Sequence, residues 1–375
     1  MIKNKKIVII GGGPAGSFCA YNLAKNGIYP IIFDDSHPRE KPCGGGISPF
    51  AQEKFPFLRK IPIPRGGGNK IEFFSPKNRK IVIMGKKKCI VFSRLHLDSF
   101  ILKMAVKEGA KLIKERVTNI KKNKNYWIIK TKKRRLKTDI IIGADGTNSL
   151  LRKKILGKFK KEDLSILFGY FIKGMEDKIA VMKFLENKKG YIWAFQRDNH
   201  TSIGLGTEFG NGSEIKKELD SFINSYFPNI KIISEWAAIL PMIRNIKTFE
   251  TPVAGENWIL IGDAAGHVDP VIGEGIPYAL WSGELAAKAI IENNPKKFDE
   301  LWRKEYGTKL IEGSKLRDLI YNKYLLEFFI EIASRSKTCS EFLYDIVTGS
   351  EEYNKILFKF IKKSPRILLE YLNII

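Results

Sequence analysis

Uninterrupted apolar runs occur at three distant places in the chain. They lie at residues 7–10 (IVII), 140–142 (III) and 258–261 (WILI), and each is followed directly by glycine. A strand that is buried on both faces of a parallel sheet has this pattern, whereas a half-buried strand alternates. The runs therefore predict three buried strands of a Rossmann-like α/β domain.

The first of these runs leads into a glycine-rich turn. Gly11, Gly13 and Gly16 follow it in Gly-x-Gly-x-x-Gly spacing, and Pro14 is well placed to begin a helix. Such a turn lets the backbone approach a pyrophosphate, and the N-terminus of the helix offers free N–H groups and a positive dipole end. This turn predicts a phosphate-binding site.

The next residues complete a strand–helix–strand unit. Gly27 ends the expected helix, Ile31–Phe33 form a second strand, and Asp34 ends that strand 18 residues after Gly16. A carboxylate at this place can accept hydrogen bonds from ribose hydroxyls. Because all these parts occur in register, they predict a dinucleotide site.

The middle of the chain has a different period. Residues 165–245 alternate between apolar and polar positions over several segments, which predicts an antiparallel sheet with one apolar face. Its Phe, Tyr and Trp residues suit the wall of an apolar pocket, although core packing explains such residues equally. A helix is expected at 214–226, and short strands are expected at 70–74 and 80–84.

Helices are expected elsewhere. One follows Ser93 and ends at Gly109, and Val117 is expected on a short strand after it. Another long helix begins near Pro277, and the last 85 residues have the apolar periodicity of helices.

Composition narrows the class of protein. The 375 residues can bury a substantial core, no apolar run of 18 or more residues lacks charges, and the first strand begins too early to leave room for a signal peptide. Cys19, Cys43, Cys89 and Cys339 show neither paired nor metal-type spacing. We therefore expect a cytoplasmic protein without a metal site.

The net charge of +25 has two interpretations. It can attract anionic lipid or nucleic acid, or it can reflect lysines spread over solvated faces. The densest basic run, 121–139, alternates around 127–129 and is expected to form an exposed β-hairpin. Few aromatic residues there can stack on bases, so the run gives little support for specific nucleic-acid binding.

Three residues outside the strand–helix–strand unit at 7–34 are candidates for catalysis or ligand binding. Cys43 precedes three consecutive glycines, which suit close approach to a ligand, although an ordinary buried thiol has the same neighbours. Arg94 begins a helix, where a guanidinium can reach a phosphate or a ribityl chain, or can simply lie at the surface. Asp263 ends the third buried strand and can bond a ligand hydroxyl.

Three stretches together resemble the FAD-dependent group-A flavoprotein fold: GGGPAG with Asp34, GADG at 143–146 and GDAAG at 262–266. The loop at 41–48 (KPCGGGIS), the run at 262–287 and the Tyr-x-Trp-x-Phe strand are similar to the geranylgeranyl reductase family. The resemblance covers roughly residues 5–290. Gln196 stands where that family usually has proline, which leaves the headgroup of the substrate open.

The resemblance implies an α/β fold (α+β overall). The expected parts are a Rossmann-like FAD-binding domain in two pieces (1–160, with a small insertion near 50–90, and 251–290), an antiparallel sheet substrate domain (161–250) and a C-terminal helical region (291–375). The implied FAD-binding residues are Gly11, Gly13, Ala15, Gly16, Asp34, Cys43, Gly44, Arg94, Val117, Asp145, Asp263, Gly273, Gly275 and Ile276. Tyr191, Trp193 and Phe195 are implied to line the isoprenoid channel.

The implied activity is saturation of isolated C=C bonds of a geranylgeranyl or other prenyl chain, on an archaeal-type lipid, chlorophyll or quinone, by hydride transfer from reduced flavin. Cys43 is the catalytic candidate, and Tyr191 or a water can equally supply the proton. The electron donor is NADPH or reduced ferredoxin, and the basic surface favours an acidic partner protein. A peripheral place on the inner face of the membrane fits a prenylated substrate.

Two other functions stay open. The same fold hosts monooxygenases and halogenases that use oxygen, and Tyr191 stands where halogenases have the first Trp of a Trp-x-Trp strand. A flavin-stabilised protein that binds RNA or a membrane without turnover is the second alternative.

Overall fold

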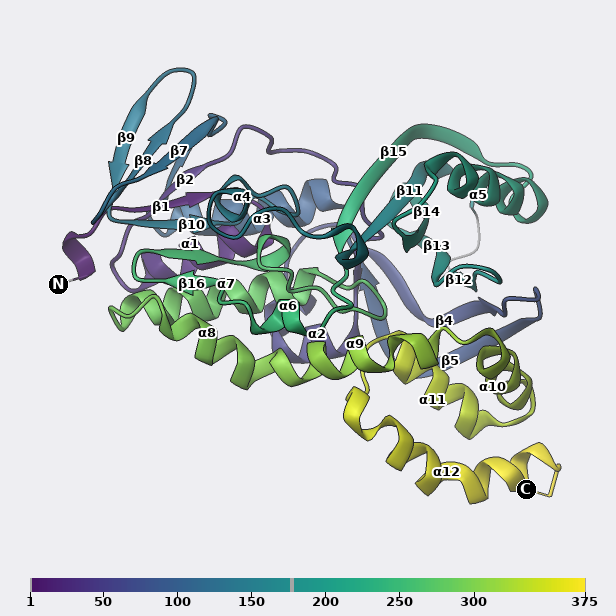
Figure 1. The fold of residues 1–375 in the computed structure, drawn as a ribbon. Helices are drawn as coiled ribbons and strands as arrows, with labels where there is room; N and C mark the ends of the chain where they lie inside the picture. The colour runs from purple at the N-terminus through teal and green to yellow at the C-terminus, as the bar shows by residue number, and fades with distance from the viewer. Residues whose placement is uncertain (1, 176–178, 375) are drawn as a thin grey trace. The chain divides into compact units, whose positions relative to one another are not determined.

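The structure is a computed structural model that describes residues 2–175 and 179–374. The chain folds into two compact units, each assembled from three separate segments (Figure 1). Unit 1 comprises Met1–Lys41, Arg94–Asp163 and Pro241–Ile311, and unit 2 comprises Pro42–Ser93, Leu164–Leu240 and Glu312–Ile375.

Unit 1 is built on a six-stranded sheet. Its strand order is β16-β17-β10-β1-β2-β6, and all neighbours are parallel except β16 and β17. The strands are β1 (Ile7–Ile10), β2 (Ile31–Phe33), β6 (Lys111–Ile113), β10 (Ile140–Gly143), β16 (Ala254–Gly255) and β17 (Trp258–Leu260). The three apolar runs are the three adjacent central strands β1, β10 and β17, so the predicted Rossmann-like sheet is confirmed.

The helices of unit 1 follow the expected boundaries. Helix α1 packs against both α3 and α7, and Gly27 after α1 has the positive φ of a helix end. The main helices are α1 (Pro14–Lys25), α3 (Arg94–Lys107), α4 (Leu150–Ile155), α6 (Lys247–Glu250), α7 (Ile276–Ile291) and α8 (Lys297–Trp302), followed by a π-helical turn at Arg303–Gly307. Helix α9 (Thr308–Ile320) crosses the boundary at Ile311, and most of its residues belong to unit 2. Val117 lies between β6 and β7 and on no strand, so that prediction is wrong.

The basic run at 121–139 contains the predicted hairpin, in which β8 (Trp127–Lys130) and β9 (Arg135–Thr138) pair antiparallel, but one face of it is not exposed. Together with β7 (Asn119–Lys122), these strands form a three-stranded sheet. Trp127 is fully buried, and its indole N–H donates to the carbonyl oxygen of Asn257 at 3.1 Å. The expected exposure is wrong for this face, because the apolar side of β8 packs into unit 1 and leaves only its polar side in solvent.

Unit 2 is built on an eight-stranded sheet of order β15-β11-β14-β13-β12-β4-β5-β3. The strands are β3 (Gly46–Ile47), β4 (Gly66–Phe74), β5 (Lys80–Val91), β11 (Leu164–Lys173), β12 (Ala180–Phe184), β13 (Gly190–Gln196), β14 (Thr201–Glu208) and β15 (Lys231–Pro241). The antiparallel sheet is confirmed, but β11 pairs with β14 rather than with β12, and β4 joins the sheet parallel to β12. Residues 46–91 therefore extend the same sheet.

The two faces of this sheet carry different cores. Helix α5 (Gly212–Tyr226) covers one face, where Leu219 and Phe222 pack with Ile203 and other aliphatic residues. Alternation along the strands places Phe171, Trp193 and Trp236 in a separate aromatic cluster, with Tyr191 and Phe195 packed against it. We call this the aromatic face.

The C-terminal residues of unit 2 are helical, as predicted. The helices are α10 (Lys323–Arg335), α11 (Lys337–Val347) and α12 (Ile356–Tyr371), and α2 (Pro49–Lys54) lies earlier in the chain. Tyr344 of α11 donates its hydroxyl to the carbonyl oxygen of Lys87 on β5 at 2.8 Å. The predicted domain limits near 160, 250 and 290 stay predictions. The division into units adds that residues 42–93 and 312–375 belong to the same unit as the eight-stranded sheet.

Glycines on β14 provide a matched test of the aromatic face. A Cβ added at Gly204 would lie 2.5 Å from Trp193 and 2.8 Å from Trp236, whereas one at Gly206 would have ordinary contacts from 3.5 Å outward. We expect Gly204→Ala to lower the free energy of unfolding by about 1–3 kcal/mol because the indoles must move. Gly206→Ala should change it by much less, as measured by urea denaturation. Equal effects of the two substitutions would contradict this packing.

Candidate active site

The glycine-rich turn of unit 1 forms a cradle at the N-terminus of α1. Gly11 has φ +102°, and a Cβ there would collide with the carbonyl oxygen of Ala144. Within the described chain, nothing lies within 4 Å of a Cβ built on Gly13, and no side chain caps α1. The first N–H groups of α1 are therefore available to an anion, and the turn fits a pyrophosphate.

Asp34 stands beside this turn and accepts several hydrogen bonds. The N–H of Gly12 donates to it at 2.7 Å, Ser36 donates through its N–H and hydroxyl at 2.8 Å each, and His37 lies at 2.9 Å through Nδ1. Burial acts to raise the pKa of Asp34, but the hydrogen bond and charge of His37 outweigh it and hold the pKa well below its ordinary value. The predicted bond to ribose stays a prediction.

Arg94 is buried and is held by a carboxylate. Its guanidinium donates to both oxygens of Asp98, through Nε at 2.7 Å and through Nη2 at 2.8 Å, while its own N–H donates to Glu40 at 2.9 Å. Burial acts to raise the pKa of Asp98, and the charge of Arg94 outweighs it and lowers that pKa. Arg94 therefore fixes the start of α3, and its contact with a cofactor stays a prediction.

His37 connects Asp34 to this pair. Its Nε2 lies 3.6 Å from Asp98, and its Nδ1 lies against Asp34. Burial acts to lower the pKa of His37, but its hydrogen bond with Asp34 and the negative charges of Asp34 and Asp98 outweigh this and raise the pKa. The loop after β2 is thus tied to α3 by buried charges.

The second motif of unit 1 follows β10. Asp145 accepts the N–H of Leu150 at 2.7 Å through one oxygen, and burial raises its pKa. Its other oxygen is buried and has no hydrogen-bond partner among the described residues. An orphaned acceptor is costly unless a ligand or water supplies a donor, so Asp145 fits a place in a ligand site.

The third motif faces the first. Gly262 has φ +59°, and a Cβ there would lie 3.0 Å from that of Ala15. Asp263 lies 3.4 Å from the ammonium of Lys41, and a Cβ on Gly275 would lie 3.4 Å from Asp263. Residues 11–16 and the turn at 262 are therefore neighbours.

Helix α7 follows the third motif in the chain. It starts at Ile276 with Gly275 as N-cap and Pro277 in its first turn, as predicted, and no side chain from the described residues caps it. Gly273 precedes it with φ +69°. The free N–H groups there suit a partial negative charge. Val117, by contrast, lies four residues beyond β6 in an irregular connection.

In unit 2 the loop of Cys43 is held by two polar side chains. Arg197 donates to the carbonyl oxygen of Cys43 at 2.7 Å, and the hydroxyl of Ser202 donates to the same oxygen at 2.9 Å. The N–H of Gly45 donates to the Cys43 sulfur at 3.3 Å. The thiol is thus set in a loop whose backbone is fixed from β13 and β14.

This loop packs directly on the aromatic face. A Cβ on Gly44 would lie 2.8 Å from Phe195 and 3.3 Å from Nε1 of Trp193, so glycine permits the close approach. The indole N–H groups of Trp193 and Trp236 are buried and find no acceptor in residues 2–175 or 179–374. Cys43, Gly44, Trp193 and Phe195 are therefore brought together within unit 2, as one site would require.

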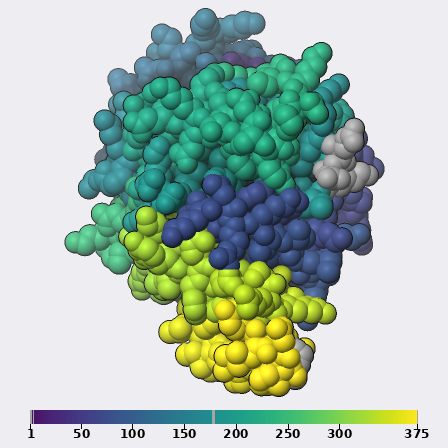
Figure 2. All heavy atoms as spheres, turned by 90° about the vertical axis from the view of Figure 1, so that its right-hand side faces the viewer, coloured from purple at the N-terminus to yellow at the C-terminus, as the bar shows by residue number. Residues whose placement is uncertain are grey.

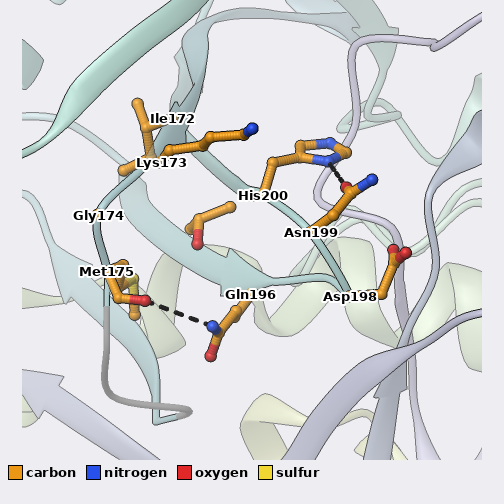
Figure 3. Close-up of a pocket in the computed structure, with 9 residues that line it drawn as sticks. Ile172, Lys173, Gly174, Met175, Gln196, Asp198, Asn199 and His200 are labelled. Atoms are coloured by element: carbon orange, nitrogen blue, oxygen red, sulfur yellow. Dashed lines mark hydrogen bonds between the residues drawn. The ribbon is translucent and has the colours of Figure 1, made fainter.

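A pocket of about 300 Å³ opens near the C-terminal end of β13 (Figure 3). Polar groups line much of it, and Gln196 donates to the carbonyl oxygen of Met175 at 3.3 Å at its edge. His200, another lining residue, lies 3.0 Å from Arg197 through Nε2. This pocket suits a polar group rather than an alkyl chain.

Sequence reasoning missed several residues of these arrangements. Arg197 and Ser202 carry no motif, and only the pairing of β13 with β14 brings them to Cys43. Trp236 joins the aromatic face from an edge strand, and His37 and Asp98 meet only because the loop after β2 lies against α3. One clue to Arg197 was present in the sequence, because this residue directly follows the predicted strand with Tyr191, Trp193 and Phe195.

The fold and these turns define a class. A parallel Rossmann-like sheet with a glycine-rich turn, a second sheet with an aromatic face and C-terminal helices make up the architecture of a flavoprotein oxidoreductase. In the described chain, no three His, Cys, Asp or Glu residues group as metal ligands. None of its described helices is both long and apolar enough to cross a bilayer.

Comparison with known proteins gives the family. No family model matches, but an uncharacterised protein of Methanosarcina barkeri is 31% identical over 84% of this chain and 83% of its own length. The digeranylgeranylglycerophospholipid reductase of Methanococcus vannielii is 27% identical over 98% of both chains, and the chloroplastic geranylgeranyl diphosphate reductase of Nicotiana tabacum is 29% identical over 84% of this chain and 70% of its own. The chain belongs to the geranylgeranyl reductase family, whose members depend on FAD.

Solved structures share the fold. A geranylgeranyl bacteriochlorophyll reductase-like protein from Thermoplasma acidophilum superposes with a TM-score of 0.79 at 21% identity, covering 96% of this chain and 98% of its own. A flavin-dependent brominase superposes with a TM-score of 0.75 at 18% identity, covering 96% and 99%. The expected fold class is confirmed.

The raised pKa of His37 gives a prediction about stability. A group whose pKa is higher in the folded state stabilises that state fully below its unfolded pKa, near 6.5, and the contribution is lost as pH rises through the folded value. We expect His37→Gln to lower the free energy of unfolding more at about pH 6 than at about pH 8.5. His96→Gln serves as the control. Equal losses at both pH values in urea titrations would contradict the buried network.

The support of the Cys43 loop gives a second prediction. We expect Arg197→Met to increase the rate at which Cys43 reacts with a disulfide reagent by about tenfold, because the loop loses a charge-assisted hydrogen bond. A chain with Cys43→Ser lacks this thiol, so the reaction that disappears from it is that of Cys43. Arg317→Met is the matched control, since Arg317 is also buried in unit 2 but bonds Glu208 at 3.0 Å. Unchanged rates in the Arg197 variant would show that the bond does not hold the loop.

Proposed function

We propose that this protein is an FAD-dependent reductase that saturates isolated C=C bonds of a geranylgeranyl or related prenyl chain. The observation that carries the proposal is the packing of the Cys43–Gly44 loop on Trp193 and Phe195. A cysteine loop held rigidly against large apolar rings suits a flat, apolar substrate. The names of the reductases from Methanococcus vannielii and Nicotiana tabacum support a prenyl chain.

An isolated alkene is not polarised by a neighbouring carbonyl, so positioning must supply much of the catalysis. The reacting carbon must be held within about 3–3.5 Å of its hydride donor in a dry environment. Reduced FAD, when bound, supplies the hydride. The rings of Tyr191, Trp193 and Phe195 would exclude water and orient the chain.

The second hydrogen must arrive as a proton. Cys43 is the catalytic candidate, because Arg197 and Ser202 fix its carbonyl and the Gly45 N–H holds its sulfur. Tyr191 and a water are the other candidates. Fixing the loop would keep the thiol at one place relative to the aromatic face.

Most of the residues proposed to hold the cofactor belong to unit 1. Gly11, Gly13, Ala15 and Gly16 would meet the pyrophosphate with the N-terminus of α1, and Asp34 would meet the adenosine ribose. Val117 would meet adenine through its backbone. The others proposed to contact FAD are Cys43, Gly44, Arg94, Asp145, Asp263, Gly273, Gly275 and Ile276.

Substrate headgroup, electron donor and location belong to the same proposal. The prenyl chain would be carried by a lipid, a chlorophyll or a quinone, and NADPH or reduced ferredoxin would reduce the cofactor. A net charge of +25 favours the acidic ferredoxin. The protein would lie in the cytoplasm, peripherally on the inner face of the membrane, where a prenylated substrate would be within reach.

Oxygen chemistry on the same fold is the second candidate, since a flavin-dependent brominase has this architecture. Tyr191 stands where halogenases have the first Trp of their Trp-x-Trp strand, and this departure favours reduction. RNA binding is disfavoured, because Trp127 is buried and Tyr126 lies under the ammonium of Lys137, 4.0 Å from its ring centre.

The activity test uses purified, anaerobically reduced protein with geranylgeranylated lipid or menaquinone. We expect the product mass to increase by two hydrogens for each bond, and Trp193→Ala to lower kcat/KM by about tenfold or more without loss of bound flavin. Trp127→Phe, in unit 1, is a control that should keep the activity. Unsaturated substrate after complete flavin reduction would refute the proposal, and oxygen consumption with bromination of an added phenol would favour the second candidate.

A further inference from the structure

Helix α12 of unit 2 is anchored along one side. Phe360 packs against Phe329 of α10 and Phe342 of α11, with ring centres 5.1 and 6.1 Å apart, and Ile367 is buried. Glu370 accepts hydrogen bonds from Ser336, at 2.6 Å, and from Thr338. The orientation of the helix is therefore fixed by contacts at both of its ends.

The chain also compensates for a proline inside this helix. Pro365 removes the N–H that would reach the carbonyl oxygen of Ile361. The hydroxyl of Ser364 donates to that oxygen at 2.7 Å instead. The helix therefore continues to Tyr371 despite the proline, and its side chains keep one continuous register.

The opposite side of α12 exposes large apolar residues. Leu357, Ile361 and Leu368 have exposed fractions of 70%, 59% and 56%, and their spacing places them on one stripe. Phe358 (68%), Leu369 (38%) and Leu372 (55%) widen it. We call these six residues the α12 stripe. A surface helix of a water-soluble domain normally turns its apolar side inward, so an outward stripe of this size marks an interaction surface.

Basic residues border the stripe. Helix α12 contains Lys359, Lys362, Lys363 and Arg366 but Glu370 as its single acidic residue. Lys362 and Arg366 are exposed, and in helical projection they lie about 20° and 60° beyond Leu369, at one edge of the stripe. Arg366 also pairs with Glu370 at 3.1 Å. Figure 2 shows the C-terminal helix, in yellow, outermost on unit 2 against the yellow-green α10 and α11.

We infer that α12 is an interfacial helix that docks this protein on an anionic lipid bilayer. The apolar stripe would enter the boundary between headgroups and acyl chains, and the basic border would lie among anionic headgroups, which is the arrangement of helices that lie in a membrane surface. A second copy of the chain suits the face less well. Two such faces in contact would bring their basic borders together, on chains that each carry a net charge of +25.

The inference goes beyond reductase activity, and its test needs neither substrate nor turnover. Purified full chain is floated with vesicles of phosphatidylcholine alone or with about 30% phosphatidylglycerol. We expect strong flotation only with the anionic vesicles, weakened by salt. Leu357→Gln, Ile361→Gln and Leu368→Gln combined should lower vesicle binding by about tenfold or more.

A matched triple variant controls for loss of exposed apolar surface elsewhere in unit 2. Ile232→Gln, Ile233→Gln and Leu319→Gln replace residues that are 51%, 50% and 56% exposed, and this variant should float like the unmodified chain. Lys362→Gln with Arg366→Gln should weaken binding to anionic vesicles and flatten its dependence on salt.

Three results would overturn the inference. The folded chain could fail to float with anionic vesicles, or the two triple variants could lose binding equally. Light scattering could instead show a dimer that the α12 triple variant separates, which would assign the stripe to a second copy. Thermal unfolding of each variant, with the same midpoint expected for all because the altered side chains are exposed, confirms that the fold is intact.

Discussion

Backbone segments of unit 1 approach one another more closely than side chains with a Cβ would allow, and the proposed cofactor site depends on this. A Cβ on Gly16 would collide with the carbonyl oxygen of Gly11, and one on Gly283 would lie 2.5 Å from the carbonyl oxygen of Ala15. Glycine at these places lets α1 lie against the β1 turn and against α7. The N-terminus of α1 is thereby directed at the carboxyl edge of the sheet, where ligands of open α/β sheets bind.

The same means of close packing serves a different purpose in unit 2. Glycines on β11 and β14 leave room for Trp236 and Trp193 to lie against the sheet, and Gly44 lets the Cys43 loop reach the rings. The loop is then fixed by a buried guanidinium, that of Arg197, which lies 5.0 Å from the ring centre of Phe171 and donates to the carbonyl of Cys43. A buried charge is tolerated where hydrogen bonds and a ring face replace water.

Charge has distinct roles in different parts of the chain. In unit 1, Asp34, His37, Asp98 and Arg94 form a buried network that orders the loop after β2. On α12 the charges border an apolar stripe and remain in solvent. Salt screens the exposed charges of α12 strongly and the buried network of unit 1 very little. Ionic strength should therefore act on membrane binding by α12 and leave the fold of unit 1 intact.

Local patterns were sufficient for the sheet of unit 1 and its turns. Uninterrupted apolar runs identify strands covered on both faces, and Pro14 and Gly27 mark the beginning and end of a helix through properties that depend only on neighbours in the chain. The helix near Pro277 and the helical C-terminus could be predicted equally well, because periodicity and the position of proline are properties of the chain itself.

Contacts between distant segments could not be inferred in this way. The hairpin in the basic run at 121–139 was expected, but its alternation cannot show that Trp127 is buried and donates a hydrogen bond to Asn257. The strand at 66–74 joins the aromatic sheet through a parallel pairing with β12, and Arg197 and Ser202 reach Cys43 only through that sheet. The sequence alone thus determined which segments become strands, helices and glycine turns, and which family they resemble. Only the tertiary structure decided which side chains surround Cys43 and which side of α12 faces solvent, because those depend on packing between residues far apart in the chain.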